Sequence, residues 1–120
     1  AALASALASL EAGDRQNARG RLQWALDHAK EEELKDLVRL RLAGLLLDEK
    51  KYDEALKLVE SKHGASFGGL YADRKGDILT AAGKVAEART AYQMALDRIS
   101  ASSAYHNIIQ MKLDALAETK

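Results

Sequence analysis

Residues 40–56, LRLAGLLLDEKKYDEAL, decide the fold. They predict the end of one helix at 33–49, a tight polar turn, and the start of a second helix at 52–62. Ala43 stands on the first helix and Ala55 on the second. Because two antiparallel helices approach closely only where their side chains are small, we expect these alanines to meet where the helices cross.

The same pattern occurs three times when the chain is aligned on the alanines at 18, 55 and 88. The copies lie 37 and 33 residues apart, close to the roughly 34 residues of a tetratricopeptide repeat. A small residue stands twelve positions before each alanine, at Ala6, Ala43 and Gly76. The turn positions five before it are Gly13, Lys50 and Gly83, and glycine there suits a left-handed helix cap. The spacing predicts three stacked helix pairs.

Composition supports this interpretation. The chain has 23 alanines and 19 leucines but only seven valines and isoleucines, and it has no proline. Alanine and leucine favour helices, and scarce β-branched residues disfavour sheets. We therefore predict one all-α domain over 1–120, a tetratricopeptide-like α-solenoid of three helix pairs plus a C-terminal capping helix. The repeats are expected at about 1–30, 33–63 and 67–100, and the capping helix at 102–118 with Ser102 or Ser103 as its N-cap.

Charge and motif content exclude several classes of function. Basic and acidic residues number 18 each, so there is no basic surface of the kind that nucleic acid requires. The stretch HGASFGGLY at 63–71 lacks the lysine of a phosphate-binding loop; there we expect Gly64 to end one helix and Ser66 to cap the next. Cysteine is absent, and the three histidines are far apart in sequence, so structural roles are expected for them. We predict no enzyme activity, no metal or other cofactor, no nucleic acid and no small-molecule substrate.

The first helices of such pairs line a concave face, where we expect the protein-binding site. Leucines dominate one end of this face and charged groups the other, which suits an amphipathic peptide with acidic groups. The predicted binding residues are Leu37, Leu40, Arg41, Gly44, Leu47, Leu70, Asp73, Arg74 and Asp77. Leu3, Leu7 and Leu10 either extend this face or belong to a core. We expect Leu40 and Leu47 to be partly exposed, so that replacing both by aspartate weakens partner capture while the domain stays helical.

Three segments carry a family resemblance: residues 40–56, YADRKGDILTAAGKVAEARTAY at 71–92, and IQMKLDALA at 109–117. They resemble the C-terminal portion of the bacterial YfgM family, ancillary subunits of the SecYEG translocon. The resemblance implies that the chain is the periplasmic part of a longer protein anchored in the inner membrane by one helix. It also implies partners: the SecYEG translocon, the periplasmic chaperone PpiD, or exported client proteins. No catalytic residue set comes with the family.

An alternative is a structural scaffold that self-associates through its first-repeat face and has no client groove. A solenoid end needs a polar cap, and the first repeat shows none. The chain itself has no apolar run long enough to span a membrane, since the longest is six residues, at 42–47.

Overall fold

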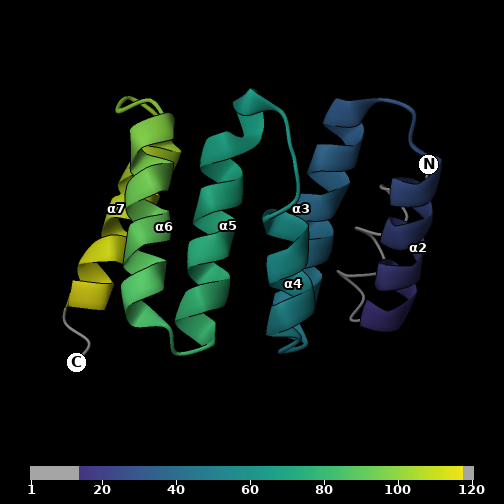
Figure 1. Cartoon of the computed structure of the whole chain (residues 1–120), viewed down its shortest axis with the longest axis horizontal. Helices are drawn as coiled ribbons and strands as arrows, with labels where there is room; N and C mark the ends of the chain where they lie inside the picture. Colours follow the sequence, from purple (N-terminus) through teal and green to yellow (C-terminus); the bar gives the residue numbers. More distant parts are fainter. Residues whose placement is uncertain (1–13, 118–120) are drawn as a thin grey trace.

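The computed structural model describes residues 14–117, and every regular element in this range is a helix (Figure 1). The predicted all-α class is confirmed. The α-helices are α2 (Arg15–His28), α3 (Glu32–Asp48), α4 (Tyr52–Val59), α5 (Gly68–Ala81), α6 (Val85–Arg98) and α7 (Ala104–Ala117), with a short 3-10 helix, η1 (Ala65–Phe67), before α5. The predicted helix at 1–12 lies outside the described residues, as do Leu3, Leu7, Leu10 and Gly13.

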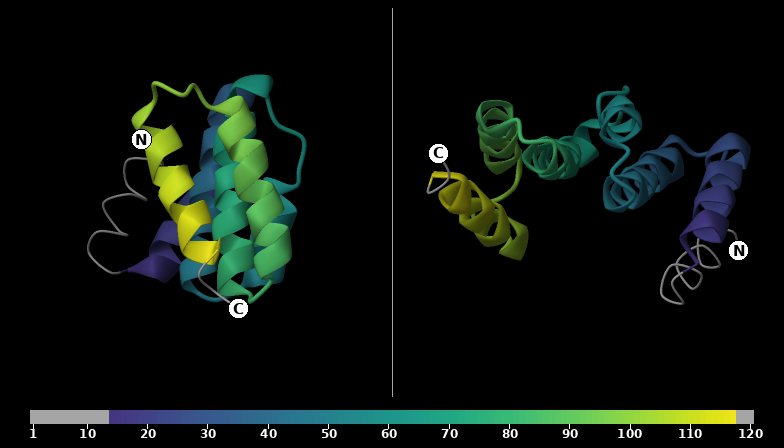
Figure 2. Two further views of the ribbon diagram at one scale, coloured as in Figure 1. Left: turned by 90° about the vertical axis from the view of Figure 1, so that its left-hand side faces the viewer. Right: turned by 90° about the horizontal axis from the view of Figure 1, so that it is seen from below.

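The helices stand side by side and pack mainly on their neighbours in the chain, as a solenoid requires. The helices of the pairs α3/α4 and α5/α6 are antiparallel. Figure 2 shows α4 and α6 on one side of the row, α3 and α7 on the other, and α5 between them. The row curves toward the side of α3 and α7, which we call the concave face; the side of α4 and α6 is the convex face. The tetratricopeptide-like architecture is confirmed over the described residues.

The repeat register places small residues where helices meet. Ala18, Ala55 and Ala88 are completely buried, and so is Ala43. Gly76 stands at the position equivalent to Ala43, and a β-carbon there would lie 2.4 Å from the ring of Tyr92. Only glycine at this position lets α5 and α6 pack as closely as they do.

The two turns within pairs have the same geometry although their sequences differ. Gly83 has a φ of 81°, as predicted for a left-handed cap, and Lys50 at the equivalent position has a φ of 63°. The following N–H groups, of Lys51 and Lys84, donate to carbonyls five residues back at 2.9 and 2.8 Å. This is the Schellman pattern, which satisfies carbonyls at a helix end. It requires of Lys50 a conformation that a lysine adopts only at a cost.

Two groups of buried residues form the core, and α5 contributes to both. Tyr71 and Ile78 belong to the cluster formed with α2, α3 and α4. Ala72 and Leu79 belong to the cluster formed with α6 and α7. Because α5 is covered on two sides, its sequence shows no single apolar stripe.

Some predicted helix ends are wrong at the junction between α4 and α5. The helix expected at 52–62 ends at Val59, and Ser66 lies inside η1 rather than capping α5, whose N-cap is Phe67. The Ser61 hydroxyl donates a 2.6 Å hydrogen bond to the Leu58 carbonyl, which replaces the next helical bond. At α7 the prediction holds for Ser103, whose hydroxyl accepts from the Tyr105 N–H at 3.1 Å.

Candidate protein-binding surfaces

The predicted binding residues come from α3 and α5, which are neighbours in the stack. On α3, Arg41 is exposed, while Leu37, Gly44 and Leu47 are half-buried. Leu40 is only 9% exposed and belongs to the core, so the expectation that it is partly exposed is wrong. Leu40→Asp would place a carboxylate in the core, and only Leu47→Asp tests the face. On α5, the half-buried set is Leu70, Asp73, Arg74 and Asp77.

Gly44 and Arg74 form the contact between the two helices on this face. A β-carbon on Gly44 would lie 3.2 Å from the guanidinium carbon of Arg74, so the guanidinium rests against the α3 backbone. Its Nε is buried and has no hydrogen-bond partner within the described part of the chain. Among the described residues Arg74 makes no ion pair, although its charge acts on Asp73 and partly offsets the rise that burial causes in the pKa of that carboxyl.

Asp73 and Asp77 are occupied by a residue of α7. The ammonium of Lys112 lies 3.0 Å from Asp73 and 3.1 Å from Asp77, and 5.9 Å from the centre of the Tyr92 ring. Asp77 also accepts a 2.7 Å hydrogen bond from the Tyr92 hydroxyl. Lys112 reaches α5 because α7 packs against α6, which is itself packed on α5.

The electrostatics of this cluster follow from its burial. Burial raises the pKa of Asp73 above its ordinary value, and the charge of Asp77 raises it further, although Lys112 opposes both. Burial lowers the pKa of Lys112, but the hydrogen bond to Asp73 and the charges of both aspartates outweigh it and hold that pKa above its ordinary value. Burial, and then the hydrogen bond to Asp77, raise the pKa of Tyr92. Because Lys112 pairs with both aspartates, the cluster links α5 to α7 rather than forming an open acidic site.

The end helix α7 is buried on one side only. Ile109 and Leu116 are in the core. Tyr105, Ile108 and Met111 are 54%, 47% and 70% exposed, so α7 does not give the described C-terminal end an all-polar surface.

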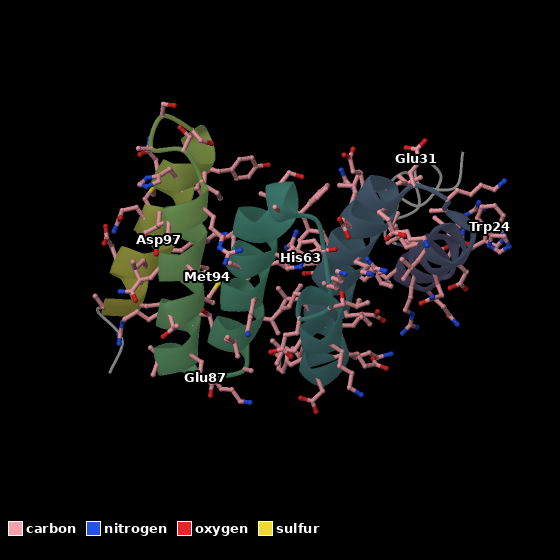
Figure 3. The ribbon with its side chains drawn as sticks, turned by 45° about the horizontal axis from the view of Figure 1, so that its top comes forward. Trp24, Glu31, His63, Glu87, Met94 and Asp97 are labelled. Atoms are coloured by element: carbon pink, nitrogen blue, oxygen red, sulfur yellow. The ribbon has the colours of Figure 1, made fainter. Side chains whose placement is uncertain are left out.

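Sequence reasoning missed a groove of about 580 Å³ on the convex face, which we call the convex groove. It lies between α4 and α6, with α5 as its floor, where Tyr71, Ala72 and Leu79 line it. Figure 3 shows His63 and Met94 on opposite sides of α5. The groove exists because α4 ends at Val59, which the sequence pattern did not predict.

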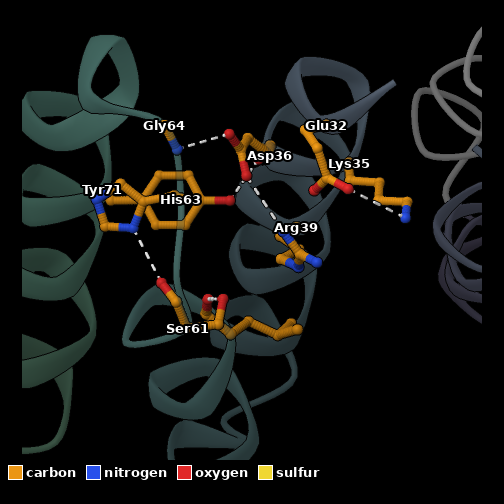
Figure 4. A network of polar contacts seen from close by, with 9 residues as sticks. Glu32, Lys35, Asp36, Arg39, Ser61, His63, Gly64 and Tyr71 are labelled. Carbon is orange, nitrogen blue, oxygen red and sulfur yellow. Dashed lines mark hydrogen bonds and ion pairs between the residues drawn. The ribbon is translucent and has the colours of Figure 1, made fainter. Parts of the chain in front are cut away.

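A buried carboxylate holds the chain beside this groove in place (Figure 4). Asp36, 3% exposed, accepts hydrogen bonds from the Gly64 N–H at 2.9 Å and from Arg39 at 3.1 Å. Its backbone carbonyl accepts one from the Tyr71 hydroxyl at 2.6 Å, and the Tyr71 ring stacks on His63 at 4.2 Å. Burial raises the pKa of Tyr71 to about 12. These contacts tie the segment after α4 to both α3 and α5.

Neither a metal-binding cluster nor a membrane-spanning helix is found within residues 14–117. No group of three or more histidine, aspartate or glutamate side chains there is arranged to hold a metal ion. None of the helices described is long and apolar enough to cross a membrane.

Comparison with known proteins agrees with this architecture. The sequence profile of the tetratricopeptide repeat-like domain family matches residues 1–118. An ancillary SecYEG translocon subunit of Neisseria gonorrhoeae is 35% identical over 116 residues, covering 97% of this chain and 56% of that protein. A protein of the same name from Escherichia coli K12 is 30% identical over 119 residues, covering 93% of this chain and 57% of that protein. No solved structure matches the chain.

The chain thus spans little more than half the length of these relatives. Both the family profile and the names of the relatives indicate an interaction module rather than a catalytic domain. The resemblance predicted from residues 40–56, 71–92 and 109–117 is confirmed by these relatives. With its helices stacked as repeats and its profile matched over nearly all its length, the chain belongs to the tetratricopeptide repeat-like domain family.

Proposed function

We propose that this chain is the protein-binding domain of a membrane-anchored ancillary subunit of the SecYEG translocon. In this proposal it works at the periplasmic face of the bacterial inner membrane and binds the translocon, the chaperone PpiD or emerging exported proteins. The names of the relatives support the translocon as the setting. The periplasmic side, the membrane anchor and the individual partners are part of the proposal.

The observation that carries the binding role is the unpaired charge on the concave face. Arg41 is exposed, and Arg74 makes no ion pair among the described residues and has a buried Nε without a hydrogen-bond partner. Half-buried Leu37, Leu47 and Leu70 provide apolar surface from the same two helices. An amphipathic segment with acidic side chains would complement both features. Asp73 and Asp77 do not contribute to this binding, because both are paired with Lys112.

Site-specific crosslinking in cells tests the proposal in the full-length protein. A photo-reactive amino acid is placed at position 41, 47 or 74, and at Gln93 as a control that is exposed on α6. We expect translocon or chaperone adducts from the three concave positions and none from position 93. Equal adducts from all four positions, or adducts with unrelated abundant proteins only, would contradict it.

Leu47→Asp gives a second, independent readout. Because Leu47 is half-buried at the edge of the core, its replacement is expected to weaken adduct formation from position 41 while circular dichroism stays helical. Normal adduct yield in a folded Leu47→Asp variant would remove Leu47 from the binding face.

A self-associating scaffold is the second candidate. The first-repeat face lies outside the described residues, and the feature that favours this function is the exposed strip of Tyr105, Ile108 and Met111 on α7. Sedimentation over a concentration series tests it. Association that rises with concentration and is lost in an Ile108→Glu/Met111→Glu variant would support the scaffold, and a monomer at every concentration would contradict it.

A further inference from the structure

Two rows of residues line much of the convex groove, one from its floor, α5, and one from its side, α6. Gly68, Ala72, Lys75 and Leu79 line it from α5, and Glu87, Ala91, Met94 and Arg98 line it from α6. Both rows follow the spacing i, i+4, i+7, i+11, which places residues along one face of a helix. Each row is about 16 Å long at the rise of an α-helix. Between the ends, Ala72 and Ala91 are small, so a third helix could approach closely there.

The groove is vacant because α4 is short. α4 has 8 residues and α6 has 14, which correspond to about 12 and 21 Å of helix. Beyond Val59 the chain continues as a non-helical segment up to η1, visible beside α5 in Figure 1. The part of α5 near its N-terminus therefore lacks the helical cover that a longer α4 would give. Met94, 46% exposed, faces this gap.

The two ends of the convex groove carry opposite charges. At one end Arg98 lies over the start of α5, since a β-carbon on Gly68 would be 2.8 Å from its Nη1. The positive end of the α5 dipole adds to this charge. At the other end stands Glu87, which is exposed. In the part of the chain that the structure describes, neither side chain has an ion-pair partner, whereas Lys75 between them is paired with Glu60 at 3.1 Å.

The chemistry of the groove selects a helix as its occupant. An extended peptide needs partners for its backbone N–H and C=O groups, but the polar side chains along the groove other than Glu87 and Arg98 are already engaged, Lys75 with Glu60, His63 with the Ser61 carbonyl and Thr90 with the Ala86 carbonyl. A helix satisfies its own backbone and presents a row of apolar side chains. An antiparallel alignment with α5 brings the negative end of its dipole to Arg98.

We propose that the convex groove binds an amphipathic helix of a partner protein, with apolar residues over Ala72 and Met94. The helix carries an acidic side chain at its C-terminal end against Arg98 and a basic side chain at its N-terminal end against Glu87. This surface is separate from the concave face, so the domain holds two protein ligands at once. The proposal does not rest on the function assigned to the concave face.

Peptides that differ in the charge at one end test the proposal with the whole chain. The probes are two fluorescent, end-capped leucine/alanine peptides of about 14 residues, a length at which an isolated helix becomes marginally stable in water. The matched peptide has lysine near its N-terminus and glutamate near its C-terminus, and the mismatched peptide has lysine near both ends, so that binding in the opposite direction does not restore the match. We expect the wild-type protein to bind the matched peptide about tenfold more tightly by fluorescence anisotropy, with the preference shrinking at high salt.

A charge-reversal variant provides the decisive comparison. Arg98 is exposed, so Arg98→Glu should fold, as circular dichroism will verify, and with an acidic group at both ends of the groove it should prefer the peptide with two lysines. Arg41→Glu on the concave face is the matched control and should keep the wild-type preference. Equal affinity for both peptides, no binding of either, or a preference that Arg98→Glu does not invert would overturn the proposal.

The same samples show whether a second copy occupies the groove. Sedimentation without peptide that reveals a dimer, abolished by Arg98→Glu and unaffected by matched peptide, would assign the groove to self-association and overturn the partner helix. Loss of the concave-face crosslinks with intact peptide preference would contradict only the proposed function.

Discussion

The carboxylate of Asp36 and the backbone N–H of Gly64 lie 2.9 Å apart although 28 residues separate them in the chain. Asp36 is nearly fully buried, and its second carboxylate oxygen accepts from Arg39. The interaction fixes the non-helical segment that follows α4 and so preserves the convex groove. The hydrogen bonds that the buried Asp36 carboxylate requires therefore also determine the shape of the convex groove.

Asp36→Ala should therefore destabilise the protein strongly. It leaves the Gly64 N–H and the Arg39 guanidinium without their acceptor at a part-buried site. We expect a loss of about 2–3 kcal/mol in the free energy of unfolding by urea denaturation. Asp36→Asn keeps an acceptor oxygen and should lose less. Asp48→Ala, at an exposed site on the same helix, is the control, and an equal loss there would contradict this account.

Gly76→Ala should also be destabilising, because its β-carbon would lie within 2.4 Å of the Tyr92 ring. The expected cost is about 1–3 kcal/mol, since the ring or the helix must shift. Gly20→Ala is the contrasting change: no described atom lies within 4 Å of its β-carbon position in α2. It should raise stability by about 0.5–1 kcal/mol through helix propensity. Thermal denaturation of the two variants is expected to give shifts of opposite sign.

Lys50→Gly should stabilise the protein by about 1 kcal/mol, because the left-handed conformation at φ 63° is costly for lysine and free for glycine. Gly83→Ala, at the equivalent turn with φ 81°, should destabilise by a similar amount of about 1 kcal/mol. Chemical denaturation compares them directly. A neutral Lys50→Gly would show that the Lys50 side chain offsets the strain.

Stability should fall in alkali. The pKa of Tyr71 is raised from 10.0 to about 12, so the folded state keeps its hydroxyl protonated while the unfolded chain ionises. The unfolded state then binds fewer protons, and the free energy of unfolding falls as pH rises between these values, by up to about 2 kcal/mol. The raised pKa values of Tyr92 and Lys112 act in the same direction.

Urea denaturation at several values between about pH 9 and pH 12 measures this slope. Tyr71→Phe should lower stability at neutral pH, because the bond to the Asp36 carbonyl is lost, yet show a shallower alkaline decline. A double variant with Tyr92→Phe should be shallower again. A slope unchanged by both substitutions would exclude these hydroxyls as its cause.

Most of the fold follows from local sequence, because the register of Ala18, Ala55 and Ala88 reports helix crossings within each repeat. Gly83 likewise predicts the turn in which it lies. The premature end of α4 is different in kind. It depends on the hydrogen bond from the Ser61 hydroxyl to the Leu58 carbonyl and on the one from the Gly64 N–H to Asp36. Helical periodicity does not predict a hydrogen bond between residues 28 positions apart.

The candidate site shows the same division. Arg41 and Arg74 were predicted correctly to lie on the first helices of their pairs, which is a matter of repeat register. The pairing of Lys112 with Asp73 and Asp77 depends on how α7 packs. Lys112 is 39 and 35 residues away from these aspartates in the chain, so local sequence does not predict the contact. Leu40 was misplaced because the face of a helix covered by several neighbours is not marked by polarity.

The two-sided burial of α5 has a consequence for how the molecule comes apart. Contacts in a stack of repeats run only between neighbours, so outer helices can detach without disturbing distant ones. Tyr71 and Ile78 belong to one cluster and Ala72 and Leu79 to the other, so unwinding α5 would remove side chains from both at once. We therefore expect amide protons from α3 to α6 to exchange together, at the free energy of global unfolding, while α7, which is buried on one side only, frays earlier. The helices α3 to α6 therefore unfold as a single cooperative unit.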